Sequence, residues 1–279
     1  FHPRTQLIMS TTALNIVLLG TGTSTGIPVV GCRCRVCRSS DRRNQRTRCS
    51  ALLTYAGHNL LIDTATDLRQ QALREDIEHI DAVLYTHCHA DHVHGIDDLR
   101  GFNRRDHNPI PLYAAPETLT NLRRNFSYIF DQRQPSGYIP KLTLHPIKEA
   151  MKLFGLEIIP IPLHHGAQMA TGYRCGPFAY LTDCNRIPDS SLALLEGLQL
   201  LVLDGLRFKP HPTHFNIPAA VAIAQSIGAE QTLLTHLSHD VDHSCADAEL
   251  PAGINLAYDG QRFSFAVQLP SSGEIHYEN

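Results

Sequence analysis

The chain has 279 residues, 43% of them hydrophobic, and a formal net charge of −3. This length allows a substantial core, and the mildly acidic balance argues against an extended nucleic-acid-binding surface. Apolar runs stay far below the roughly 20 residues that a membrane span needs, so we expect no membrane partner. Eight cysteines are too sparse for a disulfide scaffold, and the first residues lack a secretory signal, so we expect a cytoplasmic protein.

No linker, low-complexity segment or fixed repeat divides the chain, so we expect a single domain over residues 10–279. Residues 1–8 do not resemble the start of an element, and Met9 can serve as the initiator. We therefore interpret residues 1–8 as upstream or vector-derived sequence.

An apolar run from Leu14 to Leu19 predicts the first strand, and a glycine-rich loop follows it. In this loop, Gly22 to Gly26 match G-x-S-x-G, the nucleophile elbow of serine hydrolases, which requires a helix immediately afterwards. The next residues, I-P-V-V-G, cannot open that helix, and an elbow is out of place after a first strand. We expect the loop to make close backbone contacts near a site instead.

Three thiols follow within six residues, at Cys32, Cys34 and Cys37. This clustering favours a structural zinc site that lacks its fourth ligand. The alternative is a redox C-x-x-C formed by Cys34 and Cys37, but such a motif needs a helix start in a βαβ unit, which Pro28 does not provide. Arginines are dense from Arg33 to Arg48, and we interpret them as a solvated basic loop in preference to a grip on substrate phosphate.

The next elements lead to the most informative motif. Residues 51–55 and 59–63 predict a hairpin, and Thr66 is expected to cap a helix through Glu75. The buried side of this helix is expected to carry Leu68, Ala72 and Leu73. A strand over residues 80–85 then runs into the motif.

The motif is H-x-H-x-D-H, at residues 87–92. Residues two apart share a face in an extended chain, so His87 and His89 can bind one ion, while Asp91 and His92, after the turn, can hold a second. Such a pattern is rare by chance even in a chain with 17 histidines. It predicts half of a dinuclear metal centre.

Three further metal-binding side chains each follow a predicted strand. Residues 156–163 end on His164-His165, a pair over residues 171–183 ends on Asp183, and residues 231–235 lead to His236. Further strands are predicted over residues 111–114, 200–204, 254–258 and 262–267, and helices over residues 116–124, 190–196 and, capped by Asn216, 217–227. This alternation predicts an α/β fold with two mixed sheets packed face to face and helices outside.

The order of these features resembles the metallo-β-lactamase superfamily from about Leu14 to the end of the chain. The resemblance implies a four-layer αββα sandwich. It places one metal ion on His87, His89 and His165, a second on Asp91, His92 and His236, and Asp183 between them as a bridge. His165 is preferred to His164 because the family context is a polar residue, the ligand, and then a small or polar residue.

Within the superfamily, the chain is most similar to the PhnP-like phosphodiesterases encoded with the carbon–phosphorus lyase pathway, which hydrolyse phosphoribosyl cyclic phosphate. The shared features are an early G-T-G, G-C-x-C-x-x-C ending at Cys37, L-T-H-x-S-H ending at His239, and His214 before a helix. This likeness implies a structural zinc on Cys32, Cys34, Cys37 and His239, a closed set with no open position for chemistry. Segments 125–141 and 205–209 match no feature of that family, and both could line the pocket.

The implied activity is hydrolysis of a small or cyclic phosphodiester by a hydroxide held between two Mn or Zn ions. Among the ligands of these ions, Asp91 and Asp183 are expected to be catalytic. His214 is the candidate general acid, because expelling an alkoxide at neutral pH needs a proton donor. The alternative for His214 is a surface histidine beside a helix. The expected partner is the small substrate, and a homodimer is left open.

Three alternative functions remain. A tRNA 3′-processing nuclease shares the ligand set but normally carries an extended basic arm, which we do not find. A thioester or lactone hydrolase of the same fold uses the same activated water. A non-catalytic accessory role fits an incomplete ligand set, whereas this set is complete.

Overall fold

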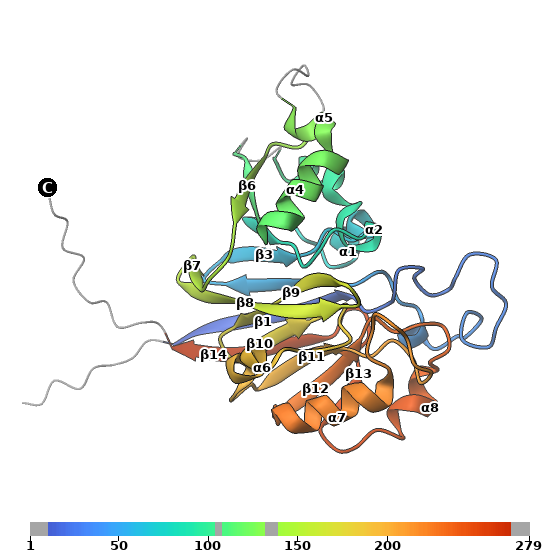
Figure 1. Ribbon diagram of the computed structural model, residues 1–279. Helices are drawn as coiled ribbons and strands as arrows, with labels where there is room; N and C mark the ends of the chain where they lie inside the picture. The colour runs from blue at the N-terminus through green and yellow to red at the C-terminus, as the bar shows by residue number, and fades with distance from the viewer. Residues whose placement is uncertain (1–10, 104–107, 132–138, 269–279) are drawn as a thin grey trace, which may run out of the picture.

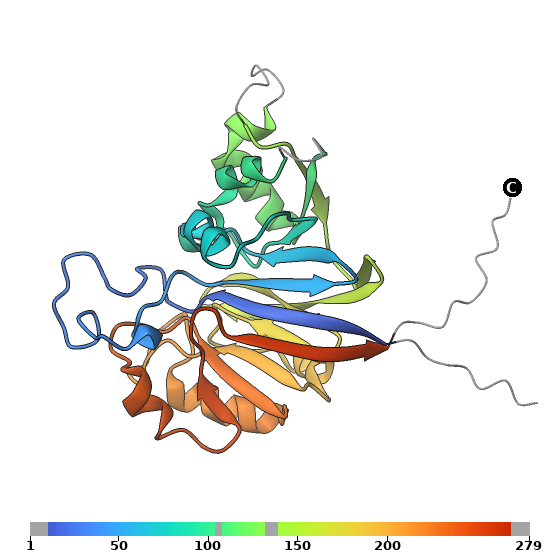
Figure 2. The ribbon, with the colours of Figure 1, turned by 180° about the vertical axis from the view of Figure 1, so that it is seen from behind.

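The computed structural model describes residues 11–103, 108–131 and 139–268. Within these ranges, two seven-stranded sheets pack face to face. Helices lie on the two outer sides, α1, α2 and α4 against the first sheet and α7 and α8 against the second (Figures 1 and 2). The arrangement confirms the predicted four-layer αββα sandwich of two mixed sheets.

The first sheet has the strand order β14-β1-β2-β3-β4-β5-β6. Its strands are β1 (Thr11–Gly20), β2 (Ser50–Tyr55), β3 (His58–Ile62), β4 (Ala82–Leu84), β5 (Ile110–Ala114), β6 (Leu142–Pro146) and β14 (Arg262–Gln268). The second sheet has the order β13-β12-β11-β10-β9-β8-β7. Its strands are β7 (Met151–Leu153), β8 (Leu156–His165), β9 (Gln168–Cys175), β10 (Phe178–Leu181), β11 (Leu200–Asp204), β12 (Gln231–Thr235) and β13 (Ile254–Leu256).

The helices are short except for α4 and α7. They are α1 (Leu68–Arg74), α2 (Ala90–Val93), α4 (Pro116–Asn125), α5 (Ser127–Phe130), α6 (Asp189–Leu192), α7 (Ile217–Ile227) and α8 (His243–Asp247), with 3-10 turns η1 (Arg42–Asn44), η2 (Ile96–Gly101) and η3 (Ala193–Leu195). The predicted cap of α7 is confirmed, since the Asn216 side chain accepts a hydrogen bond from the Ala219 amide. None of the helices in the described ranges is long and apolar enough to cross a bilayer.

The core follows from the period-two alternation of the strands. In β1, the buried side chains of Leu14, Ile16 and Leu18 face the second sheet. The intervening Val17 and Leu19 pack in the cluster under α1, α2 and α4. Both faces of this strand are therefore buried, which explains its nearly continuous apolar sequence.

The parallel strands of both sheets have their carboxyl ends near one pocket. Strands β3 to β6 are mutually parallel, and so are β10 to β13. Polar segments that follow β4, β10 and β12 line one pocket together with the turn after β8. This placement agrees with the general position of ligand sites in open α/β sheets, outside the carboxyl ends of the strands.

Two details of α1 were predicted wrongly. The residue before α1 is Asp67, which makes no side-chain cap, and the Thr66 hydroxyl donates to the Ala90 carbonyl oxygen instead. Leu73 is 66% exposed, whereas Leu68 and Ala72 are buried as predicted. Thr66 therefore links the start of α1 to α2 and does not cap α1.

Candidate metal centre

The H-x-H-x-D-H segment changes conformation in its middle. His87 follows β4 in extended chain, and His89 is the residue immediately before α2. Asp91 and His92 lie on the first turn of this helix, whereas His87 and His89 are in extended chain. This change of direction separates the four side chains into two pairs, as the sequence predicted.

A buried carboxylate, which the sequence analysis did not single out, orients this segment. Asp63 accepts hydrogen bonds from the Thr86 amide and hydroxyl, both at 2.8 Å, and from His92 Nδ1 at 2.7 Å. Nδ1 of His87 lies 3.0 Å from the Thr86 hydroxyl oxygen. With Nδ1 engaged in both rings, Nε2 of His87 and Nε2 of His92 are left to face the centre.

The first group of donors comprises His87, His89, His165 and Asp183, whose ligand atoms lie within 4.8 Å of one another. His165 Nε2 is 3.3 Å from His89 Nδ1, and His87 Nε2 is 3.6 Å from Asp183 Oδ2. His165 Nδ1 donates to the Thr213 carbonyl oxygen at 2.9 Å, which leaves Nε2 as the donor atom. His164 lies outside the group and contacts Arg186.

The second group comprises Asp91, His92, Asp183 and His236, again within 4.8 Å. His236 Nε2 lies 3.4 Å from Asp91 Oδ2 and 3.4 Å from Asp183 Oδ1. Asp183 thus turns Oδ2 to the first group and Oδ1 to the second, the position of a bridging ligand. Its backbone φ is +55° and that of His236 is +60°, conformations that non-glycine residues rarely adopt and that concentrate at functional sites.

The electrostatics of the two groups fit bound cations. Nε2 of His87 and Nε2 of His92 are buried and have no hydrogen-bond partner. Burial works to raise the pKa of Asp183, yet His236, His92 and His87 hold it well below its usual value. Burial opposes a charge on His236, but Asp183 and the hydrogen bond that His236 donates to Asp91 raise its pKa to about 9. A site that stabilises carboxylates and cations in this way, with imidazole and carboxylate donors, suits two divalent metal ions.

His214 lies beside both groups. Its Nδ1 donates to Asp204 Oδ2 at 2.7 Å, and its ring stacks on that of His236 at a centroid distance of 4.7 Å. Asp204 ends β11, as Asp63 follows β3. Neither aspartate was predicted as a site residue; an aspartate that closes an apolar strand is the sequence signal that could have found both. Since Nδ1 is bonded to a carboxylate, the Nε2 atom of His214 is free for proton transfer.

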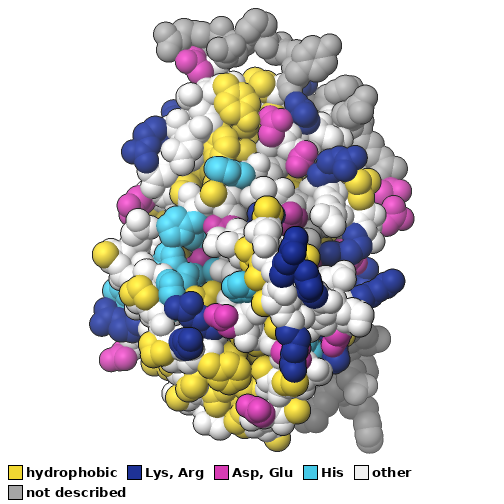
Figure 3. Space-filling model, turned by 90° about the vertical axis from the view of Figure 1, so that its right-hand side faces the viewer, with side chains coloured by type: hydrophobic (Ala, Val, Ile, Leu, Met, Phe, Trp, Pro, Cys, Tyr) yellow, Lys and Arg dark blue, Asp and Glu magenta, His cyan; other side chains and the backbone are white. Residues whose placement is uncertain are grey.

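The pocket above these groups has a volume of about 360 Å³. Its lining residues are Ser24, His89, Asp91, His165, Ala167, Gln168, Asp183, Thr213, His214 and His236. Figure 3 shows histidine side chains gathered in a hollow of this face, with Lys and Arg side chains near it. Residues 205–209 and the described parts of segment 125–141 do not line it, so their predicted position is wrong, and residues 132–138 lie outside the described ranges.

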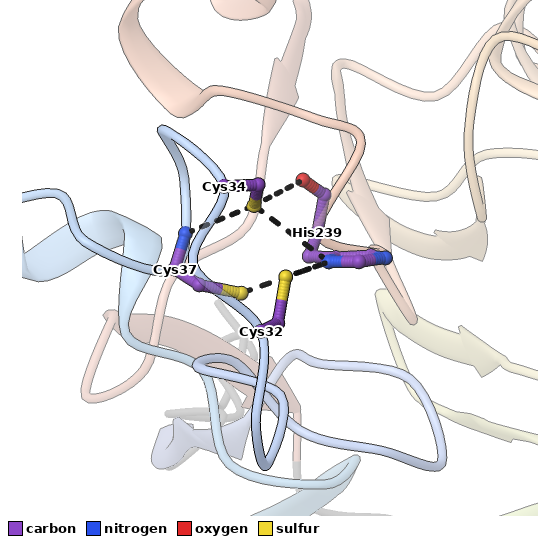
Figure 4. A group of neighbouring side chains, drawn as sticks. All are labelled: Cys32, Cys34, Cys37 and His239. Atoms are coloured by element: carbon purple, nitrogen blue, oxygen red, sulfur yellow. Dashed lines mark hydrogen bonds between the residues drawn. The ribbon is translucent and has the colours of Figure 1, made fainter.

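A separate group of donors, the thiol corner, consists of Cys32, Cys34, Cys37 and His239 (Figure 4). His239 Nδ1 lies 3.3 Å from Cys32 Sγ, 3.7 Å from Cys34 Sγ and 3.6 Å from Cys37 Sγ. The amides of Val29 and Cys37 donate to the sulfurs of Cys37 and Cys34. Four donors that face one point fit a tetrahedral zinc, and the spacing leaves none of the cysteines in a disulfide.

The arginines of the early loop do not form one solvated surface. Arg46 is 1% exposed, and its guanidinium donates to the Val241 carbonyl oxygen. Arg48 pairs with Asp67 at 2.9 Å, and Arg43 pairs with Asp41 at 2.8 Å. The predicted basic loop is therefore wrong for Arg46, which packs inside, while most of its neighbours are exposed.

Comparison with known proteins agrees with this architecture. Residues 58–237 match the beta-lactamase superfamily domain. The fold and the paired His/Asp groups define the class, and the chain belongs to the metallo-β-lactamase superfamily.

Similar proteins narrow the family within this superfamily. A crystal structure described as a new diphosphatase from the PhnP family is 44% identical, with a TM-score of 0.88 over 93% of this chain and 100% of that one. The chain therefore belongs to the PhnP family. The coenzyme PQQ synthesis protein B of Methylobacterium radiotolerans is 31% identical over 69% of this chain and 73% of its own length.

A protein of Porphyromonas gingivalis named octanoyltransferase is also similar. It is 41% identical over 252 residues, which are 88% of this chain but 51% of that protein. The chain thus spans about half the length of this relative.

Proposed function

We propose that this protein is a hydrolase of small phosphodiesters that depends on two divalent metal ions, Mn or Zn. The observation that carries the proposal is the position of Asp183, whose two oxygens face two separate groups of His and Asp donors at the base of a pocket. The 44% identity to a PhnP-family diphosphatase supports a substrate that contains a phosphoryl group.

The metal ions, when bound, supply an activated water and neutralise negative charge on the phosphoryl oxygens. The residues of the chain hold and orient the donors for this chemistry. Asp63 fixes His92 and the Thr213 carbonyl oxygen fixes His165, so that each ring presents Nε2 to the centre. Such orientation of metal ligands by a second hydrogen bond raises the affinity of a site for its metal.

His214 has the role of general acid in this proposal. Asp204 holds its Nδ1 at 2.7 Å, so the imidazole presents Nε2 to the pocket that it lines. A proton carried on Nε2 passes to the leaving oxygen as the P–O bond breaks. The carboxylate of Asp204 accepts the hydrogen bond from Nδ1 and so keeps the ring in position.

A diphosphate is a second candidate substrate, because the PhnP-family relative is described as a diphosphatase. Its phosphoanhydride presents the same phosphoryl oxygens to the same groups. Octanoyl transfer is not proposed for this chain, since the Porphyromonas relative has a further half that this chain does not match. We also propose one structural zinc on Cys32, Cys34, Cys37 and His239, supported by their convergence on one point.

The test is a substrate panel after reconstitution with Mn²⁺ or with Zn²⁺. It comprises bis(p-nitrophenyl) phosphate, a cyclic nucleotide, a nucleoside diphosphate sugar, a precursor tRNA, a lactone and a thioester. The proposal predicts metal-dependent turnover of the small phosphorus substrates above that of the other three. Faster hydrolysis of the lactone, the thioester or the tRNA would contradict it.

A further inference from the structure

A tight turn, residues 23–26, lies at the rim of the pocket and belongs to neither group of metal-type donors. After β1 the chain makes a turn over Thr23–Gly26, closed by a hydrogen bond of 2.8 Å from the Gly26 amide to the Thr23 carbonyl oxygen. Ser24 is exposed at the tip of this turn and lines the pocket. Among the described residues its hydroxyl has no hydrogen-bond partner, so it is available to a bound molecule.

The turn is anchored on two sides. The Thr23 amide donates to the Leu237 carbonyl oxygen at 3.0 Å, and the Gly22 amide donates to the Thr47 carbonyl oxygen at 2.8 Å. A Cβ on Gly22 would lie 2.9 Å from the Arg46 carbonyl oxygen, so a glycine is required for this close approach. Leu237 directly follows His236, and the turn is therefore fixed relative to a predicted metal ligand.

Arg48 stabilises the same turn by a hydrogen bond to its backbone. Its Nε donates to the Ser24 carbonyl oxygen at 3.2 Å, and its Nη1 pairs with Asp67 Oδ1 at 2.9 Å. The Arg48 amide also donates to Asp67 Oδ2 at 2.9 Å. The guanidinium is thus engaged with protein atoms, which argues against a direct grip on phosphate and gives it a positioning role for Ser24.

We propose that the Ser24 hydroxyl binds a non-bridging phosphoryl oxygen of the substrate, at the end of the pocket next to His236, and so favours phosphorus over carbonyl substrates. This inference rests on the proposed function. A phosphodiester carries its charge on two non-bridging oxygens, whereas a carbonyl substrate presents one oxygen. A further donor at the rim therefore has a partner only in the phosphorus substrates.

The test compares Ser24→Ala with Thr25→Ala. Thr25 lies in the same turn and is exposed, but it does not line the pocket, and its hydroxyl donates to the Gly26 carbonyl oxygen. A hydrogen bond to a charged oxygen leads us to expect a fall in kcat/KM of about tenfold or more for Ser24→Ala on bis(p-nitrophenyl) phosphate and a cyclic nucleotide. Ser24→Thr keeps the hydroxyl and is expected to retain most activity, and Thr25→Ala to stay within about twofold of wild type, with unchanged metal content and Tm in all three.

Arg48→Gln separates positioning from a direct contact. If Arg48 acts through Ser24, Arg48→Gln lowers kcat/KM in the wild-type background and has little further effect in the Ser24→Ala background. Equal losses in both backgrounds would overturn the positioning role. Normal kinetics of Ser24→Ala, or equal losses for Ser24→Ala and Thr25→Ala, would overturn the Ser24 contact, whereas a wild-type protein inactive on every phosphorus substrate would refute the proposed function itself.

Discussion

The pocket and the thiol corner share one segment, the loop after β12, and differ in how open they are to a bound molecule. His236 belongs to the pocket and His239, three residues later, to the thiol corner. The corner gathers three sulfurs and one nitrogen around a point and has no place in the pocket lining, whereas the pocket gathers imidazoles and carboxylates beside a cavity of about 360 Å³. In the proposed assignment, donor type and access, rather than position in the fold, distinguish the structural metal site from the catalytic one.

The comparison also shows how the two sites depend on each other. The corner ties the loop that follows β1 to the loop that follows β12. The first of these loops carries Ser24, and the second carries His236. Loss of the corner is therefore expected to weaken the fold and loosen the pocket, while loss of a pocket donor is expected to stop turnover and leave the corner intact.

Asp183→Asn is expected to have the largest effect. A neutral amide bridges two cations poorly, and the loss of several kcal/mol of charge stabilisation predicts a fall in kcat of about 10³-fold or more on every phosphorus substrate. Asp189→Asn, at an exposed position of α6, is the control. Near-normal rates in a metal-loaded Asp183→Asn protein would contradict the bridging role.

His214→Ala is expected to separate leaving-group chemistry from metal chemistry. A cyclic nucleotide loses an alkoxide that needs a proton, so its turnover should fall by about 10²–10⁴-fold. The p-nitrophenolate leaving group is stable as an anion, and bis(p-nitrophenyl) phosphate should retain much more of its rate. Equal losses on both substrates would give His214 a positioning role, and no loss on either would contradict any role of His214 in turnover.

Cys34→Ser is expected to act on stability more than on chemistry. A zinc corner with three donors binds its ion more weakly, and we expect Tm to fall by roughly 5–10 °C, with a smaller loss of activity per folded molecule. Cys245→Ser removes an exposed cysteine that is outside the corner and is the matched control. Loss of activity without loss of Tm would place Cys34 in the chemistry instead.

The smallest effect is expected from His243, the first residue of α8. Burial and the neighbouring Arg46 lower the pKa of His243 to about 4, below the ordinary value near 6.5 of the unfolded chain. The unfolded state therefore takes up a proton first, and stability present above pH 6.5 is lost as the pH falls toward 4, by about 1–2 kcal/mol down to pH 5. Urea unfolding at pH 6.5 and pH 5 should show a smaller loss of unfolding free energy for His243→Gln than for the wild type. An equal loss in both proteins would contradict the assignment of this pH dependence to His243.

The sequence predicted the fold because its strands are long apolar runs that end on polar residues. The runs that became β1, β8 and β11 are buried on nearly every residue or on alternate ones. The strands β6 and β7 were not predicted. β6 ends its sheet with no fully buried side chain, and β7 has three residues, so neither carries a hydrophobic period that can be recognised.

The ligand-type residues were predicted, but the residues that orient them were not. Asp63 and Asp204 acquire their roles from contacts with histidines 29 and 10 positions away in the sequence, and Ser24 acquires its role from its place in the pocket lining. A histidine cluster identifies itself by spacing, because its members are close in sequence. An orienting carboxylate is a single aspartate at a strand end, and only the fold shows which histidine it faces.

The central claim is that the protein holds one closed zinc site and one open, exchangeable pair of ions. Elemental analysis before and after mild chelation tests it most directly. We predict about three metal ions per loaded chain and about one retained zinc after chelation, with the fold intact and phosphodiester turnover lost until Mn²⁺ or Zn²⁺ is returned. Loss of all metal with the fold intact, or full turnover with a single retained ion, would contradict the claim.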